Sequence, residues 1–413
     1  MSDAQSSAEV VVRVRAAVTD AFERAQVHFL TRLVQQPSCT REPEDVERAA
    51  AIVDEAAAAI GLSIARTADP ERRFADHRVY ATPSTRDDDR AVALVGHVDT
   101  VFPRAMGFEG FVRDGDVVRG PGVLDMKSGL SAVLFALSAI RHAAPDVWSQ
   151  LRARFVCVSD EEVGSPSSRT LFAALAPRTS AALVFEAGRR EDRIVTRRRG
   201  GGLWTITAHG RAAHAGNHHA DGISAIHALA LLVPRLEAIT DYARGLTVSV
   251  GLFEGGSAKN TVPERASLGL DARFETARDA AELEQRLRAL VEDPYAGIDG
   301  VPDRLRNVRF VLEGGVTRPP MEASEAAQAL RERYERSAAA CGLSIGEAGL
   351  QGGGSDANLL SAAGVPCIDG LGPWGEHFHQ TREWSSLESL RRRTEALALF
   401  LLEEAAGGGD RRA

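Results

Sequence analysis

Imidazole and carboxylate side chains in five short stretches of this chain together make a ligand set for divalent metal ions. The candidates are His97, Asp125, Glu162, Glu186 and either His377 or His379. Nitrogen and oxygen donors of this kind suit Zn²⁺ and are tolerated by Co²⁺ and Mn²⁺. Three carboxylates and two imidazoles are enough for two ions if one carboxylate bridges them, as two-metal hydrolytic sites require. Spacing alone does not decide which of His377 and His379 is the ligand.

Two further carboxylates stand beside these candidate ligands. Asp99 is two residues after His97, where it can hold the second imidazole nitrogen, as carboxylates near metal-bound histidines usually do. Glu161 directly precedes Glu162, and neighbouring residues at that position point in different directions. The pair therefore predicts one metal ligand and one general base, the combination that metal-assisted hydrolysis needs.

Apolar segments must form the strands that position these groups. The runs 91–95, 154–159 and 181–185 are short and continuous, which is typical of strands covered on both faces of a sheet. Reactive groups in open α/β sheets collect beyond the carboxyl ends of the strands, so the residues that follow the three runs are expected to meet there. The apolar run 129–140, after Asp125, predicts a helix.

The pattern changes near residue 197 and changes back near residue 314. Residues 1–196 and 315–413 have the strand and helix pattern of an α/β domain. Residues 197–314 have the order strand, helix, strand, strand, helix, strand, which predicts an inserted α+β domain with antiparallel strands and one helix over 221–239. We interpret the three arginines 197–199 as a solvated or hinge segment.

Composition excludes several classes of function. Hydrophobic residues make up 44% of the chain and the net charge is −8 without a basic stripe, so we expect a globular protein that does not bind nucleic acid. No apolar stretch approaches the roughly 20 residues that span a bilayer, and no signal-peptide pattern is present, so a cytoplasmic protein without membrane contact is expected. The four scattered cysteines predict buried free thiols.

Six blocks of the sequence resemble the M20 metallopeptidase family, most closely its glutamate carboxypeptidase branch. They are GHVDTVF, GPGVLDMKSG, SDEEVGS, GRAAHAG, GGGSDA and HQTREW, in the family's order. The resemblance implies an α/β, mixed-sheet catalytic domain with two zinc ions, and an inserted α+β lid through which many members form homodimers. It implies hydrolysis of the amide bond of an N-acyl amino acid or short peptide with a free C-terminal carboxylate. The alternative is a deacylase of the acetylornithine, succinyl-diaminopimelate or aminoacylase type.

The resemblance also implies a role for each candidate residue of the catalytic domain. It makes Glu161 the general base and Asp125 the carboxylate that bridges the two zinc ions. The other ligands are divided between the ions, His97 and Glu186 on one, Glu162 and His379 on the other. His379 is chosen over His377 because the family's ligand stands a few residues before a glutamate, here Glu383.

Residues of the lid and of a glycine-rich loop are implied to contact the substrate. His214 in GRAAHAG matches the family histidine that donates to the oxyanion, often across a dimer interface. Substrate-binding positions of the family are matched by Asn260, Arg273 and Arg318, of which Arg318 would grip the substrate α-carboxylate. The loop residues Gly353, Gly354 and Ser355 either bring backbone N–H groups close to the substrate or form a flexible turn.

Overall fold

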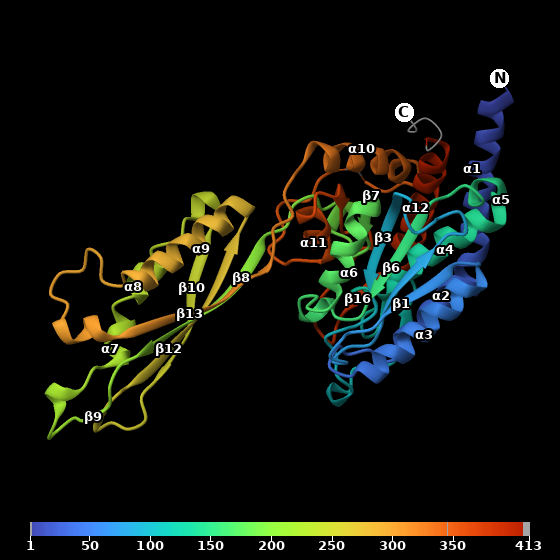
Figure 1. Ribbon diagram of the computed structural model, residues 1–413. Coiled ribbons are helices and arrows are strands. Elements are labelled where there is room, and N and C mark those ends of the chain that lie inside the picture. The colour runs from blue at the N-terminus through green and yellow to red at the C-terminus, as the bar shows by residue number, and fades with distance from the viewer. Residues whose placement is uncertain (1, 345, 408–413) are drawn as a thin grey trace. The chain divides into compact units, whose positions relative to one another are not determined.

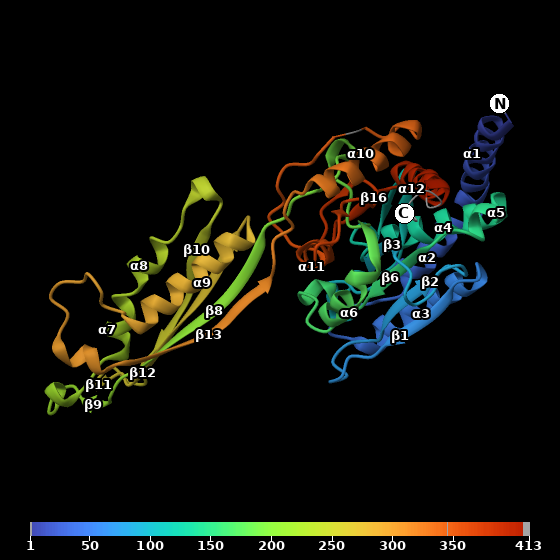
Figure 2. The ribbon, with the colours of Figure 1, turned by 45° about the horizontal axis from the view of Figure 1, so that its top comes forward.

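The computed structural model describes residues 2–344 and 346–407, which divide into two compact units (Figures 1 and 2). Unit 1 is formed by Met1–Arg197, Ala323–Gln351 and Ser355–Ala413, and unit 2 by Arg198–Glu322 with Gly352–Gly354. The predicted end of the inserted domain at residue 314 falls inside strand β13 (Arg309–Arg318), which pairs along its length with β8 (Gly200–His209). Unit 2 therefore extends beyond residue 314.

Unit 1 is built on a six-stranded sheet with the order β1-β2-β6-β3-β7-β14. Its strands are β1 (Ser63–Thr67), β2 (His77–Ala81), β3 (Ala91–His97), β6 (Ala153–Val158), β7 (Thr179–Val184) and β14 (Cys367–Ile368). β6, β3, β7 and β14 run parallel, whereas β1 and β2 pair antiparallel. Every residue of β3 and β6 is buried, as their continuous apolar runs predict. The predicted α/β class with a mixed sheet is confirmed.

Helices cover both faces of this sheet. They are α1 (Ser2–Ala21), α2 (Val27–Gln35), α3 (Pro43–Ala59), α4 (Lys127–Ala143), α5 (Pro145–Trp148), α6 (Ser168–Leu175), α10 (Glu325–Ala340), α11 (Asp356–Ala362) and α12 (Leu387–Gly407), with a π-helical stretch η1 (Phe22–Gln26) between α1 and α2. α4 connects β3 to β6 in one direction, and α6 connects β6 back past β3 to β7. Because such crossovers are right-handed, the two helices lie on opposite faces, as Figure 1 shows.

The segment Val123–Ala143, which includes α4, is long and apolar enough to cross a membrane by length and composition. The expectation that no stretch approaches this length is therefore wrong. Of the apolar 18-residue stretch within this segment, 83% is buried inside the protein, and α4 contacts α1, α12 and β3. Apolar surface that is already covered by protein marks a core helix, so the segment carries no indication of a membrane.

A second small sheet in unit 1 has the order β15-β16-β5-β4. Its strands are β15 (Gly375–Glu376), β16 (Trp384–Ser386), β5 (Val117–Arg119) and β4 (Val112–Asp114). The loop that carries His379 connects β15 to β16, and the loop that carries Asp125 follows β5. Pairing of β16 with β5 therefore brings these two loops together. Strands of two or three residues are too short to show a period, so the sequence did not predict them.

Unit 2 has a four-stranded antiparallel sheet of order β10-β12-β8-β13 and a two-stranded ribbon β9-β11. The further elements are β9 (Ala213–His214), β10 (Thr247–Gly255), β11 (Thr261–Val262), β12 (Arg265–Phe274), α7 (Ala225–Ala230), α8 (Val233–Glu237) and α9 (Ala277–Glu292). The single helix expected over 221–239 is wrong. Two short helices replace it, and Pro234 lies in the first turn of α8, where its missing N–H is tolerated.

The arginine run 197–199 lies at the boundary between the two units. The two units divide between Arg197 and Arg198. Arg198 is buried and donates from Nη1 to Gly353 O at 3.0 Å, so the expectation of a solvated segment is wrong for this residue. Arg199 lies 3.3 Å from Glu275. All four cysteines, which lie within the described residues, are buried and free, as predicted.

Candidate metal centre and catalytic site

The carboxyl ends of β3, β6 and β7 bring three of the predicted groups to one edge of the sheet. His97 is the last residue of β3 and pairs in register with Val158, the last residue of β6. Two residues separate β6 from a single 3₁₀ turn, η3 (Glu161–Val163), which carries Glu161 and Glu162. Glu186 follows β7 by two residues, and its Oε1 lies 3.7 Å from His97 Nε2. Parallel pairing thus places residues from distant parts of the sequence side by side.

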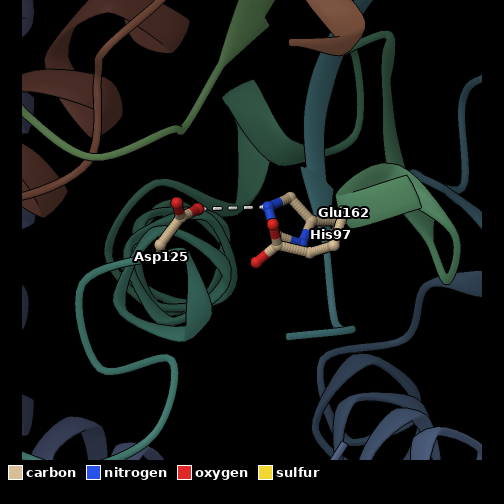
Figure 3. Close-up of side chains that lie close together, drawn as sticks. All are labelled: His97, Asp125 and Glu162. Carbon is tan, nitrogen blue, oxygen red and sulfur yellow. Dashed lines mark hydrogen bonds and ion pairs between the residues drawn. The ribbon is translucent and has the colours of Figure 1, made fainter. Parts of the chain in front are cut away.

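Asp125 lies between two imidazoles and turns a different oxygen toward each. Its Oδ1 is 3.2 Å from His97 Nε2 and its Oδ2 is 3.3 Å from His379 Nε2. His379 Nε2 is also 3.0 Å from Glu162 Oε2. Figure 3 shows the side chains of His97, Asp125 and Glu162 directed toward one another, and one ligand atom from each lies within 4.8 Å of the others. A carboxylate with an imidazole at each oxygen has the arrangement that a bridging ligand needs.

The structure thus gathers all five ligand candidates and separates the two histidines that spacing left open. His379 contacts Asp125 and Glu162, whereas the acidic neighbour of His377 is Glu376, at 3.9 Å. Both histidines have left-handed backbone, with φ 68 at His377 and 61 at His379. Strained backbone of this kind persists where the surrounding structure holds it, often at functional sites.

The charges of this cluster fit divalent cations. Burial raises the pKa of Glu162 to about 8 and that of Glu186 well above its usual range, and the charge of Asp125 adds to both shifts. Glu162 Oε1 is buried without a hydrogen-bond partner among residues 2–344 and 346–407. A buried oxygen of this kind carries a desolvation cost unless a hydrogen-bond donor or a cation satisfies it, and a metal ion would do so. The donor set, carboxylates and imidazoles without thiolates, is the one that Zn²⁺, Co²⁺ or Mn²⁺ accepts.

The two imidazoles of the cluster are held by the carboxylates around them. Hydrogen bonds to Asp125 and Glu162 raise the pKa of His379 to about 10. Burial alone would lower the pKa of His97, but hydrogen bonds to Asp125, Asp99 and Glu186 hold it well above its usual range. The same two histidines hold the pKa of Asp125 well below its usual range despite its burial. Positive charge is therefore favoured throughout the cluster.

Asp99 contacts two parts of the site: the His97 imidazole and the turn that carries Glu161 and Glu162. The closest partner of His97 Nδ1 is the backbone carbonyl of Asp99, at 2.9 Å, and the Asp99 carboxylate is 3.4 Å away. That carboxylate accepts hydrogen bonds from Glu161 N at 3.3 Å and Glu162 N at 3.2 Å. The predicted support of His97 is thus shared between backbone and side chain. Asp99 acts by positioning other groups and is not itself among the clustered ligands.

Glu383 and Lys127 are buried titratable residues of the site, and the sequence alone assigned neither of them a function. Glu383 Oε1 accepts hydrogen bonds from Leu124 N at 2.6 Å and Asp125 N at 3.0 Å, so it holds the backbone of the loop that carries Asp125. Lys127 Nζ donates to Gln36 O at 2.8 Å. Burial raises the pKa of Glu383 to about 8 and lowers that of Lys127 to about 7. The only sequence signal for this pair was that each stands near a candidate ligand.

An open pocket of about 400 Å³ is lined by residues that neighbour two of the ligands in sequence. Gly188 and Arg189 follow Glu186, and His377 and Phe378 precede His379. The remaining lining residues are Arg190, Trp374, Gly375 and Glu376. The Arg189 guanidinium lies over the Phe378 ring at 5.8 Å, within the range of a cation–π contact. The pocket therefore offers aromatic rings and two guanidinium groups.

His214 and Asn260 of unit 2 lie together on the β9-β11 ribbon. Asn260 O accepts a hydrogen bond from Ala215 N at 2.9 Å, and Thr261 pairs with His214. The backbone N–H groups of Gly216 and Asn217 each donate to His214 Nδ1 at 3.1 Å. A neutral imidazole that accepts at Nδ1 carries its proton on Nε2, so His214 is a preset Nε2–H donor. The side chain is exposed.

Arg273 and Arg318 lie at the opposite end of the unit 2 sheet from His214. Both pair with Gly201, one on each side of β8. Arg273 forms two hydrogen bonds with Asp271, and Arg318 packs on Gly354, where an added Cβ would lie 2.2 Å from Arg318 Cδ. The predicted substrate-binding residues of unit 2 thus form two separate groups.

Ser355 is a helix cap in this structure. Its hydroxyl donates to Asp369 Oδ2 at 2.6 Å and accepts from Ala357 N, at the start of α11. Its backbone N–H donates to Asn358 Oδ1 at 2.9 Å, which completes a capping box. That N–H is therefore already used, and the expected donation from Ser355 N to a substrate is not supported. Gly353 N and Gly354 N stay candidates.

Known proteins share both the sequence pattern and the fold. The profile of peptidase family M20/M25/M40 matches residues 93–403. Carboxypeptidase G2 of Pseudomonas sp. strain RS-16 is 25% identical over 394 residues, which cover 95% of this chain and 92% of that protein.

Solved structures agree with this match at the level of the fold. Aminopeptidase PepT from Bacillus cereus is similar with a TM-score of 0.72 and 21% identity, over 92% of this chain and 98% of that one. A dinuclear metal-binding M20 peptidase from Bacillus subtilis is similar with a TM-score of 0.67 and 15% identity, over 94% and 99%. The resemblance drawn from the six sequence blocks is confirmed. The chain belongs to peptidase family M20/M25/M40, as a metal-dependent peptidase or amidohydrolase.

Proposed function

We propose that this enzyme is a two-zinc carboxypeptidase that releases a C-terminal residue, glutamate by preference, from an N-acyl amino acid or short peptide. The observation that carries the proposal is the cluster in which Asp125 faces His97 and His379 while Glu161 stands beside it. One ligand atom each of His97, Glu161 and Glu186 lies within 4.8 Å of the others, which supports Glu161 as a base beside the metal ions. Carboxypeptidase G2, a relative over 95% of the chain, supports the choice of a carboxypeptidase.

The residues present divide the work of amide hydrolysis. His97, Asp125 and Glu186 would hold one Zn²⁺, and Asp125, Glu162 and His379 the other. When bound, two zinc ions supply Lewis-acid polarisation of the scissile carbonyl and acidify water. Glu161 takes the proton of the attacking water and delivers it to the leaving amine. Asp99 and Glu383 keep the loops of these groups in place through backbone hydrogen bonds.

Arg318 supports selection for a free C-terminal carboxylate. A guanidinium group presents two parallel N–H donors that match a carboxylate, a geometry that lysine does not offer. The close packing of Gly354 against Arg318 limits the positions that this side chain can take. The N–H groups of Gly353 and Gly354 lie in the same unit and are the candidates for further contacts with the substrate.

The geometry of unit 2 supports a homodimer in which each site uses His214 of the partner subunit. Arg318 pairs with Gly201 at one end of β8, while His209, eight residues further along, lies at the end from which the chain continues to β9 and His214. Eight residues of strand extend about 26 Å at roughly 3.3 Å per residue. A dipeptide spans about 7 Å at full extension. One substrate therefore cannot touch both Arg318 and His214 of the same chain.

The pocket lined by Arg189, Trp374 and Phe378 is our candidate for the acyl side of the substrate. Its walls continue directly from the ligands Glu186 and His379, so a group bound there lies next to the scissile bond. Aromatic rings favour apolar or planar acyl groups, and the two arginines favour a negative charge on that group.

Hydrolysis of a substrate panel tests the proposal. Acyl-glutamate, acyl-alanine, acyl-aromatic and acyl-ornithine compounds are offered to Zn²⁺-loaded protein and to EDTA-stripped protein. We expect the stripped protein to be inactive, zinc to restore it, and acyl-glutamate to react fastest. Faster release of another amino acid would replace the glutamate assignment by a deacylase assignment. Equal activity of stripped and loaded protein would refute the two-metal mechanism.

A further inference from the structure

A five-residue segment between α2 and α3, residues 36–40, contacts both loops that carry the central metal ligands. Gln36 O accepts the hydrogen bond of the buried Lys127 ammonium at 2.8 Å, two residues after Asp125. Ser38 O accepts from Thr100 N at 2.8 Å, and Thr40 N donates to Thr100 O at 3.1 Å, three residues after His97. The segment lies outside residues 93–403, the part of the chain that the family profile matches.

Within this segment, Thr40 makes a side-chain contact with the site. Its hydroxyl donates to Asp99 Oδ2 at 2.7 Å, and its side chain is buried with 2% of the residue exposed. The same carboxylate accepts from Glu161 N and Glu162 N and approaches His97 Nδ1. The Asp99 carboxylate thus connects the Thr40 hydroxyl to the predicted base Glu161 and to the predicted ligands Glu162 and His97.

We propose that Thr40 is a positioning residue of the hydrolase, which sets the orientation of Asp99 and through it the placement of Glu161, Glu162 and His97. The inference rests on the proposed function, because it assigns Thr40 to metal binding and turnover. A carboxylate that binds two backbone N–H groups and an imidazole at the same time must stay in a single rotamer. The Thr40 hydroxyl bonds the oxygen that also accepts from Glu162 N, and so opposes rotation of the carboxylate away from the turn.

General magnitudes set the size of the effect expected on removal of the Thr40 hydroxyl. A hydrogen bond to an ionised acceptor is shorter and roughly twice as strong as one between neutral groups. Outer groups that hold metal ligands typically change metal affinity or activity by about 10- to 100-fold when they are removed. Valine has nearly the shape of threonine, so Thr40→Val removes the donor and leaves the volume of the site.

The test compares Thr40→Val and Thr40→Ser with a matched control in the full-length enzyme. The control is Thr179→Val, because Thr179 is also buried and its hydroxyl also donates one hydrogen bond, to Leu175 O at 2.9 Å. Thr179 begins β7, at the end of that strand away from Glu186. Each variant is measured for zinc affinity by titration calorimetry, for kcat and KM on the preferred acyl amino acid, and for thermal unfolding without metal.

We expect Thr40→Val to lower zinc affinity or kcat by about 10- to 100-fold with little change in KM. Thr40→Ser, which keeps the hydroxyl, should recover most of the loss, and Thr179→Val should change unfolding alone. In an Asp99→Asn background the effect of Thr40→Val should be much smaller, because both changes break the same link.

Several outcomes would overturn the proposal. The proposal is wrong if Thr40→Val keeps the zinc affinity and kcat of the wild type. It is also wrong if Thr40→Ser loses as much zinc affinity or kcat as Thr40→Val. If Thr40→Val does not fold, the pair Thr40→Ala and Thr40→Ser, which differ by the hydroxyl alone, gives the same comparison. A wild-type enzyme without zinc-dependent turnover would refute the proposed function instead, and this is seen before any Thr40 variant is made.

Discussion

A mixed dimer of two inactive variants tests the origin of His214 in each site. One subunit carries His214→Ala and the other Glu161→Gln, and the two are co-expressed with different affinity tags so that the mixed dimer can be purified. Removal of an oxyanion donor costs about 10²–10³ in kcat, or about 2.7–4 kcal/mol, and removal of a general base about 10²–10⁴. Each parent homodimer is therefore expected to have at most about 1% of wild-type activity.

The distance along β8 determines the expected activity of the mixed dimer. In the proposed homodimer, the eight residues from Gly201 to His209, about 26 Å of strand, keep the Arg318 end of β8 away from the end that leads to His214. The proposal therefore has His214 act on the substrate held by the partner subunit. In the mixed dimer one site then combines an intact Glu161 with an intact His214, and the other site lacks both. The purified mixed dimer should have about half of wild-type kcat per dimer, and an unpurified one-to-one mixture about one quarter.

Initial rates on the preferred acyl amino acid, with zinc content measured on the same samples, give the result. Both parents should bind zinc like the wild type, since neither altered residue is a predicted ligand. If the mixed dimer is no more active than its parents, His214 acts within its own chain or has no part in catalysis. A monomeric protein by sedimentation, active at all concentrations, would refute the same reasoning without any variant.

Three further predictions follow from single contacts of the site. Free Zn²⁺ at 100 times the dissociation constant of a site should stabilise the apoprotein by about 2.7 kcal/mol for each site filled, and Glu162→Gln should reduce the total stabilisation at the same zinc concentration, as measured by thermal unfolding. Gly354→Ala should raise KM for substrates with a free carboxylate by about 10-fold or more, because its Cβ would lie 2.2 Å from Arg318 Cδ. The control is Gly352→Ala, whose Cβ would meet no described atom within 4 Å, and an equal rise in KM for both variants would contradict the explanation. Arg189→Ala should lower kcat/KM for acidic acyl groups more than for neutral ones, and an unchanged ratio on the substrate panel would remove the pocket from the acyl side.

Local pattern predicted the central strands and the chemistry at their ends. The runs that became β3, β6 and β7 are continuous and apolar, and a parallel sheet must place their carboxyl ends together, so His97, Glu162 and Glu186 could be expected near one another without a structure. The inserted domain could be predicted from its strands, which alternate apolar and polar residues, whereas the strands of the flanking chain are continuous apolar runs. A single helix over 221–239 was wrong because proline in the first turn of α8 marks a new start.

Tertiary structure decided the features that depend on contacts between distant segments. His379 rather than His377 faces Asp125 because β16 pairs with β5, and strands of three residues leave no periodic signal. Ser355 is a cap because Asn358 and Asp369 fold back on it. The donation from Thr40 to Asp99 joins residues 59 positions apart in sequence. The amino-acid sequence by itself determined the ligand types, the central strands β3, β6 and β7 and the family, since these depend on local patterns. The partners of each polar group were set by three-dimensional packing.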